Sequence, residues 1–184
     1  MASLTAVEID SERLHLRPTG EVYAQVIFEE FTSAITTFMF PAPASSIDET
    51  LAFLRGARAG IEAGIELEVV VLRKPEDEFI GHGGLHHVDS ATPELGIWIK
   101  ESAHGQGYGR EAVTALCDWA LENLDFDYLT YPVDRRNVPS RRIPEALGGV
   151  IEAEYQKTNA SGNLLDLLEY RIYPEHMRRR RGVT

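Results

Sequence analysis

The stretch His104-Gly105-Gln106-Gly107-Tyr108-Gly109-Arg110 lies between an extended apolar segment, residues 95–99, and a segment with helical periodicity. In that second segment, small or apolar residues recur with i, i+3, i+4 spacing, which predicts one buried face of a helix. These residues are Ala112, Val113, Leu116, Cys117, Ala120, Leu121 and Leu124. A strand, alternating glycines and a helix start together expose free backbone N–H groups at the positive end of a helix dipole. The stretch therefore predicts a phosphate-binding loop, with a purely structural connection as the alternative.

Two common phosphate loops do not fit this stretch. A nucleotide P-loop ends in Gly-Lys-Ser/Thr, whereas this one continues as Gly109-Arg110-Glu111. A dinucleotide loop has the pattern Gly-x-Gly-x-x-Gly and an acidic residue at the end of the next strand. Here the third glycine comes one position early, and Asp127 precedes the next predicted strand.

The stretch resembles the acyl-CoA diphosphate loop of the GNAT acetyltransferases, whose pattern is Gln/Arg-x-x-Gly-x-Gly/Ala. It is most similar to their RimJ/RimL branch, which acetylates protein N-termini. His104 stands where the wider superfamily has Gln or Arg, a position that varies in this branch. The resemblance extends over most of the chain through three more segments in the family's order: the opening strand at 11–18, the fourth strand at 94–99, and the last helix, which includes Asn137-Val138-Pro139-Ser140 and Glu145-Ala146-Leu147-Gly148.

The resemblance implies an α/β (α+β) fold over residues 1–184 as a single domain. We expect a mixed, mainly antiparallel, seven-stranded sheet with helices on both faces, and strands four and five splayed apart to admit the pantetheine arm. A proline in the fifth strand, Pro132, suits such a gap because its missing N–H would have no partner to lose. Periodicity predicts strands near 13–18, 66–73, 79–88, 128–133, 151–157 and 164–173, and helices over 20–40 and 46–63.

The last helix departs from the family pattern at two positions. Pro144 removes the hydrogen bond to the carbonyl of Ser140, and we predict a helix broken there. Gly149 replaces the usual phenylalanine after Leu-Gly, so a core anchor is expected to be missing. Residues 170–184 are expected to form a basic C-terminal tail.

Composition and charge limit the class of protein. Hydrophobic content of 43% and charged content of 26% are ordinary for a globular domain, and no apolar run reaches membrane-spanning length. Net charge is −11, which disfavours nucleic acid and favours cationic partners such as amines. Cys117, the single cysteine, falls on the buried helix face and is expected to pack in the core. These features favour a cytoplasmic protein without a membrane partner.

The resemblance implies an acetyl-CoA-dependent N-acetyltransferase that transfers the acetyl group directly to a primary amine, with acetyl-CoA as cosubstrate and no metal. The family's acceptor in this branch is a protein N-terminal amine, and a homodimer is common among relatives. By position, the residues implied in acetyl-CoA binding are Ile97, Trp98, Ile99, His104, Gly105, Gln106, Gly107, Tyr108, Gly109, Arg110, Asn137 and Ser140. Cationic residues near the expected cleft are Arg110, Arg135, Arg136, Arg141 and Arg142.

Three side chains are candidates for proton transfer. Glu94 opens the fourth strand and is the first candidate for general base, with a solvated carboxylate as the alternative. Ser140 matches the family position near the sulfur and could protonate the leaving thiolate, with helix capping as the alternative. His87, or His86, is a reserve base. Strand alternation places His82 and His86 on one face and His87 on the other, which does not favour a metal site.

Two alternatives to a protein N-terminus remain open at this stage. One is a small-molecule amine, such as a polyamine or an antibiotic, because the acceptor wall has no shared sequence pattern. The other is an acyl-CoA-binding module without transfer activity, which the altered last helix suggests.

Overall fold

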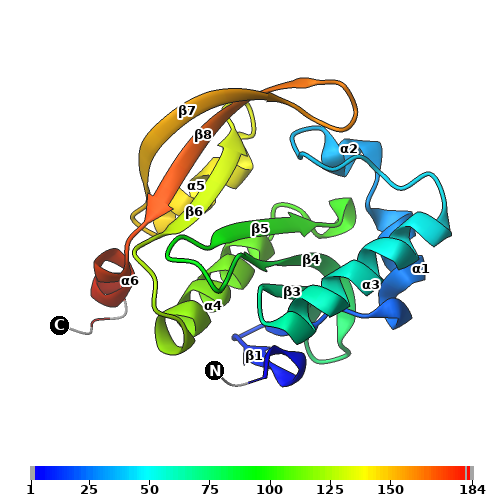
Figure 1. Cartoon of the computed structure of the whole chain (residues 1–184), viewed down its shortest axis with the longest axis horizontal. Helices are drawn as coiled ribbons and strands as arrows, with labels where there is room; N and C mark the ends of the chain where they lie inside the picture. The colour runs from blue at the N-terminus through cyan, green and yellow to red at the C-terminus, as the bar shows by residue number, and fades with distance from the viewer. Residues whose placement is uncertain (1–2, 181, 183–184) are drawn as a thin grey trace.

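Eight strands join in one sheet in the computed structural model, which describes residues 3–180 and 182 (Figure 1). The strands are β1 Ile9–Asp10, β2 Leu14–Pro18, β3 Glu66–Arg73, β4 Glu78–His86, β5 Glu94–Ile99, β6 Leu129–Asp134, β7 Val150–Thr158 and β8 Leu164–Ile172. Their order across the sheet is β1-β2-β3-β4-β5-β6-β8-β7, and only the β5–β6 pair is parallel. The mixed, mainly antiparallel sheet is confirmed. The eighth strand is the two-residue β1, which is too short for a periodic signal.

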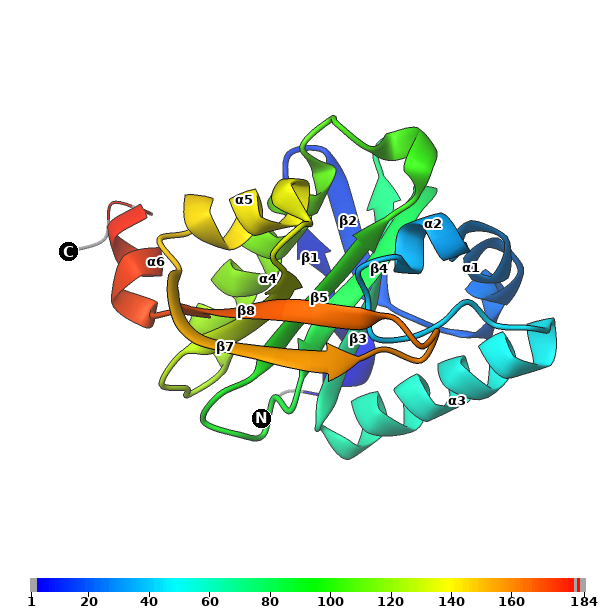
Figure 2. The ribbon, with the colours of Figure 1, turned by 90° about the horizontal axis from the view of Figure 1, so that it is seen from above.

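Helices cover both faces of the sheet, as expected (Figure 2). The α-helices are α1 Ala24–Glu30, α2 Ser33–Thr36, α3 Ile47–Ala63, α4 Tyr108–Asn123, α5 Val138–Ala146 and α6 Pro174–Arg180. Three short 3-10 helices are η1 Leu4–Ala6, η2 Glu21–Tyr23 and η3 Glu101–Ala103. Among the described residues, no helix combines the length and the apolar character that crossing a bilayer requires.

Strand β3 shows why the sheet needs a helix layer on each side. Val69 and Val71 pack with α4 in the larger core cluster, whereas Val70 and Leu72 pack with α1 and α3 in the second one. All four side chains are at most 1% exposed. A strand that is covered on both faces has an uninterrupted apolar run instead of alternation, as the sequence of β3 has.

The two predicted N-terminal helices differ in outcome. The helix at 46–63 is confirmed as α3, because Ser46 Oγ accepts from Glu49 N and Gly64 ends the helix at φ +76°. The continuous helix at 20–40 is wrong. Phe31 leaves the helical region at ψ 66°, and Thr32 caps the separate helix α2 through Ile35 N. A side-chain cap at this point competes with continuation of the helix.

The predicted break at Pro144 is also wrong, because α5 continues through it to Ala146. The helix has only nine residues, so Pro144 lies in the last turn and deletes a single hydrogen bond. Gly149 is explained by the same turn: its N–H donates to the Pro144 carbonyl at 2.8 Å, and a Cβ there would lie 2.9 Å from that oxygen. The glycine therefore permits a close backbone approach in place of a core anchor.

The segment expected as a basic tail begins with the end of β8 and continues into helix α6. Met177 of α6 is fully buried, and Arg180 pairs with Asp118 of α4 at 2.5 Å. Of the arginines at 178–181, Arg181 lies outside the described residues.

Candidate active site

Residues 104–107 of the glycine loop at 104–110 are exposed to solvent. Gly105 and Gly107 have φ values of +74° and +82°, a region that residues with side chains rarely adopt. No described residue accepts a hydrogen bond from the backbone N–H groups of residues 105–110. A Cβ added at Gly109 would lie 3.4 Å from Ile143 Cδ1 of α5, so a side chain there would be tightly packed. The loop and the α4 N-terminus together have the donor set that a diphosphate needs.

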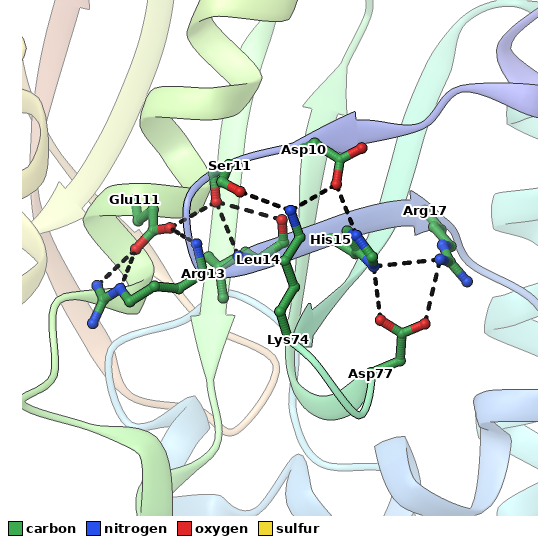
Figure 3. A network of polar contacts seen from close by, with 9 residues as sticks. All are labelled: Asp10, Ser11, Arg13, Leu14, His15, Arg17, Lys74, Asp77 and Glu111. Atoms are coloured by element: carbon green, nitrogen blue, oxygen red, sulfur yellow. Dashed lines mark hydrogen bonds and ion pairs between the residues drawn. The ribbon is translucent and has the colours of Figure 1, made fainter.

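Arg13, immediately before β2, contacts both this loop and the first turn of α4; Figure 3 shows its ion pair with Glu111. Its guanidinium donates to the Gln106 carbonyl at 3.1 Å and lies over the Tyr108 ring, 4.5 Å from the centroid. Its Nε also donates to Glu111 Oε2 at 2.7 Å, and Ser11 donates to Oε1 at the same distance. Burial alone would raise the pKa of Glu111, but these hydrogen bonds lower it below its usual value. Glu111 thus stays ionised and ties the first turn of α4 to the β1–β2 hairpin.

His104 and the arginines near the loop differ in whether other groups of the protein engage their side chains. His104 Nε2 donates to the Ile99 carbonyl at 2.6 Å, which fixes the loop to the end of β5. Arg135, Arg136 and Arg141 are engaged with acidic or phenolic side chains on β6, β7, β8 and α5. The other two, Arg110 and Arg142, are exposed, and no described residue pairs with either. They are the cations best placed to meet phosphate groups.

Strands β5 and β6 separate immediately after they meet. They share one register pair, Glu94 with Thr130, while β4 pairs with β5 along its whole length. One backbone edge at Ile97, Trp98 and Ile99 therefore faces no strand partner. Pro132 lies two residues beyond Thr130, where β6 pairs with β8 alone. This geometry fits an extended amide-bearing arm such as pantetheine, which needs backbone donors and acceptors on one side.

The start of α5 places hydroxyl groups beside the gap. Asn137 Oδ1 accepts from Ser140 N at 3.3 Å, so Asn137 is the helix cap and Ser140 is free of that role. Ser140 Oγ lies 2.8 Å from the hydroxyl of Tyr131, a buried residue of β6. Burial raises the pKa of Tyr131 to about 12, so the phenol keeps its proton. The phenol can therefore donate to Ser140 Oγ, which leaves the serine proton available to another acceptor.

Of the candidate bases, Glu94 is the first residue of β5, and His87 comes directly after the last residue of β4. Burial raises the pKa of Glu94, while His86 and His87 lower it in part. His87 follows β4 with φ +55°, and its side chain is 71% exposed, 4.0 Å from Glu66. Neither side chain lines the cavity described next.

A cavity of about 510 Å³ lies on the α1–α3 side of the sheet and reaches β5 at Gly96, Ile97 and Trp98. Its walls are apolar: α1, α3 and residues 39–44 contribute aromatic, methionine and proline side chains, with Phe31 packed on Trp98 at 5.0 Å between ring centroids. The β7–β8 turn closes one side, because Ala160 N donates to the Phe40 carbonyl at 2.9 Å.

The floor of the cavity carries the polar groups Glu68, His82 and His86. His86 Nδ1 lies 2.7 Å from Glu66 Oε2 and 3.2 Å from Glu68 Oε1. Glu66, Glu68 and His86 are close enough together to surround a metal ion. His86 Nδ1 is also within hydrogen-bonding distance of Glu66 Oε2, so an ion-paired cluster accounts for the arrangement as well.

Three residues of this site were missed from the sequence. Arg13 and Tyr131 act on groups 93 and nine positions away in the chain, and no local pattern reveals such contacts. Glu68 did have a signal, because it is the single acidic residue inside the apolar run of β3. A carboxylate in a strand that is covered on both faces indicates a buried charge with a specific use.

Cys117 has no place in this chemistry. It is fully buried on α4, and burial raises the pKa of its thiol to about 12. The site thus includes a gap between β5 and β6 with an unpaired edge of β5, the neighbouring hydroxyls of Ser140 and Tyr131, and the carboxylates at the cavity. Such a set of groups is compatible with direct transfer without an acyl-enzyme.

Comparison with known proteins agrees with this geometry. Residues 13–150 match the family model described as acetyltransferase (GNAT) domain. The chain is 24% identical over 168 residues to the uncharacterized N-acetyltransferase p20 of Bacillus licheniformis, covering 88% of this chain and 93% of that protein.

Two solved structures have the same fold. RimL, the ribosomal L7/L12 α-N-protein acetyltransferase in complex with coenzyme A, superposes with a TM-score of 0.81 at 17% identity, covering 91% of this chain and 98% of that one. The ribosomal-protein-S5-alanine acetyltransferase from Vibrio fischeri gives 0.77 at 18% identity, with 92% and 97% covered. With three quarters of its length inside the family model, the chain belongs to the GNAT family of N-acetyltransferases.

Proposed function

We propose that the protein transfers the acetyl group of acetyl-CoA to a primary amine that occupies the cavity between the sheet and α1–α3. The observation that carries the proposal is the meeting of two spaces at β5. Ile97 and Trp98 line the cavity on one side, and the same strand has an unpaired edge toward the gap before β6. An acyl group held at that edge and an amine in the cavity would be within reach of each other.

The chain's own residues have distinct roles in this proposal. The loop at 104–110, with Arg110 and Arg142, binds the phosphates of acetyl-CoA. The free edge of β5 orients the thioester, whose carbonyl the backbone polarises. Ser140, supported by Tyr131, gives a proton to the departing sulfur. Glu94, at the point where β5 and β6 meet, remains a candidate to move protons to solvent.

A protein N-terminal amine is our first choice of acceptor, because two relatives of the same fold act on ribosomal proteins. The apolar walls of the cavity also suit a small amine, which is the second candidate. A long polyamine fits less well, because the two carboxylates that line the cavity, Glu49 and Glu68, are outnumbered by aromatic, methionine and proline side chains.

Two measurements test the proposal. Calorimetry should show acetyl-CoA binding with micromolar or tighter affinity, and thiol release should follow when short peptides with free N-termini or small amines are added. Absence of acetyl-CoA binding by the folded protein would overturn the proposal. Binding without turnover on any amine would instead favour the acyl-CoA-binding module.

A further inference from the structure

Glu68 is a buried carboxylate that the assignments above leave without a role. It lies on β3, is 7% exposed, and reaches the floor of the cavity. No described residue donates a hydrogen bond to its carboxylate within normal geometry, and the imidazoles of His86 and His82 lie 3.2 and 3.6 Å from its oxygens. A buried carboxylate without donors is costly, so its presence calls for a ligand or a reaction that uses it.

Glycines on β4 and β5 leave room beside Glu68 for the His86 imidazole, which lies 3.2 Å from the carboxylate. Glu68 pairs in register with Gly84, and Gly84 with Gly96, so this row across three strands has no other side chain. Gly96 also makes room for His86, because a Cβ there would lie 3.3 Å from Nε2. The row leads from the carboxylate to the strand edge where the thioester is expected to lie.

The charged groups that face Glu68 favour a cationic ligand. From β4, His86 approaches at 3.2 Å and His82 at 3.6 Å; burial lowers the pKa of His82 to about 3, so that ring is neutral. The carboxylates of Glu66 on β3 and Glu94 on β5 raise the pKa of His86, and Glu49 of α3 lines the same cavity. The surface that α1 presents to the cavity is apolar, formed by Ile27 and Phe28. Acidic groups thus outnumber basic ones around the carboxylate.

Proton exchange at Glu68 suits neutral conditions. Burial raises the pKa of Glu68 to about 7, against an opposing effect of His86. Burial would lower the pKa of His86, but the carboxylates of Glu68 and Glu66 raise it. A base that titrates near the working pH both accepts and releases protons efficiently.

We propose that Glu68 binds the ammonium group of an acceptor amine attached to an apolar group, and removes its first proton before acetyl transfer. This inference rests on the proposed function. The ammonium gives one proton to Glu68, and the neutral amine then forms the C–N bond as the C–S bond breaks. Ser140 gives its hydroxyl proton to the departing thiolate, and the second proton lost by the attacking nitrogen restores the Ser140 hydroxyl. The proton on Glu68 leaves through His86, so the net products are amide, thiol and one proton.

The test compares Glu68→Gln and Glu68→Asp with wild type, using 2-phenylethylamine and spermidine as acceptors. At pH 7, Glu68→Gln should lower kcat/KM for 2-phenylethylamine about 100-fold, while calorimetry shows unchanged acetyl-CoA affinity. At pH 9.5 the solution supplies free amine, and the deficit should shrink to about tenfold or less. In the wild type, kcat/KM should rise with pH near neutrality as Glu68 loses its proton. Glu68→Asp should keep this rise. Glu62→Gln on the exposed side of α3 is the matched control and should behave as wild type.

Each alternative outcome has one meaning. A Glu68→Gln deficit that stays constant from pH 7 to 9.5, or a preference for spermidine over 2-phenylethylamine, would overturn the inference while acetyl transfer itself stands. A wild-type protein that neither binds acetyl-CoA nor acetylates any amine overturns the proposed function, and this inference with it. Should Glu68→Gln lose acetyl-CoA binding through misfolding, the wild-type and Glu68→Asp profiles decide, because flat profiles between pH 6 and 8 contradict a proton-accepting Glu68.

Discussion

The loop proposed to bind the cosubstrate and the cavity proposed to bind the acceptor are built in opposite ways. The loop is seven consecutive residues; no described residue accepts from the backbone N–H groups at 105–110, and two glycines have positive φ. The cavity draws on α1, α3, residues 39–44, three strands and the β7–β8 turn, and its polar groups include the buried side chains of Glu68 and His82. Backbone recognition of a constant diphosphate needs only local geometry. Recognition of an individual amine needs side chains that tertiary packing brings together.

The difference also appears in the electrostatics. On the cosubstrate side, Glu111 is ionised and fully hydrogen-bonded, with its pKa lowered. On the acceptor side, Glu68 has no donors and its pKa is raised. The first carboxylate stabilises the structure, and the second one weakens it in exchange for reactivity. Four predictions test whether this division holds, in order of decreasing effect.

Replacing Glu68 with Gln should stabilise the folded protein at alkaline pH. The folded carboxyl holds its proton up to about pH 7, whereas the unfolded one releases it near 4.5. The folded form is therefore favoured at low pH, and wild-type stability falls as pH rises from about 4.5 to 7. A neutral glutamine removes this dependence, so the variant should gain up to about 3 kcal/mol relative to wild type between pH 4 and pH 8. Urea unfolding at the two pH values measures it; a difference that does not grow with pH would show an unstrained Glu68.

Replacing Ser140 with Ala should lower kcat about 100-fold and leave acetyl-CoA affinity unchanged, because the hydroxyl is needed only when the thiolate departs. Tyr131→Phe should cost about tenfold, since it removes the donor that orients Ser140. Steady-state kinetics with a calorimetric Kd separates the two effects. Tyr155→Phe, on the half-exposed edge strand β7, is the control. If Ser140→Ala changed only the KM for acetyl-CoA, the serine would belong to binding alone.

The same division explains what the sequence could predict. The order of strand, glycine loop and helix at 95–124, the Ser46 cap of α3 and the bounds of β3 depend on neighbours within a few positions, and all are confirmed. That the glycine loop binds a diphosphate stays a prediction. Phe31 ended a helix that periodicity alone would have continued, because Thr32 offered a competing cap. Pro144 was expected to break α5, but a proline in a last turn costs little.

The unpredicted part of the candidate site depends on distant neighbours. Glu68 stands out in β3 as an acidic residue in an apolar run, yet its surroundings come from β4, β5 and α3. Glycines at 84 and 96 suggest a bulge or a close contact when viewed along one strand. Only the register of three strands places them in one row with the carboxylate. The family pattern describes the cosubstrate, which every relative shares, and says little of an acceptor wall that differs among them.

Replacing Gly107 with Ala should weaken acetyl-CoA binding about tenfold. A side chain at φ +82° costs about 1–2 kcal/mol, so the loop will move away from the conformation that presents its N–H groups. Gly56→Ala is the matched control, because Gly56 lies within α3 with open space around it, and alanine there should slightly stabilise the helix. Equal acetyl-CoA affinities for both variants in calorimetry would mean that the diphosphate does not depend on this loop.

Replacing Arg13 with Ala should raise the acetyl-CoA Kd about fivefold, the smallest effect expected here. Arg13 contacts no part of the cosubstrate in our assignment; it holds the Gln106 carbonyl and Glu111, so its loss loosens the loop without removing a donor. Glu111→Gln should act through the same contact, and the double variant should then be little worse than either single one. Arg55→Ala, which breaks an exposed pair with Glu21, should leave the Kd unchanged. Strict additivity of Arg13→Ala and Glu111→Gln would mean that the two residues support the loop independently. That outcome would contradict the single shared contact on which this prediction depends.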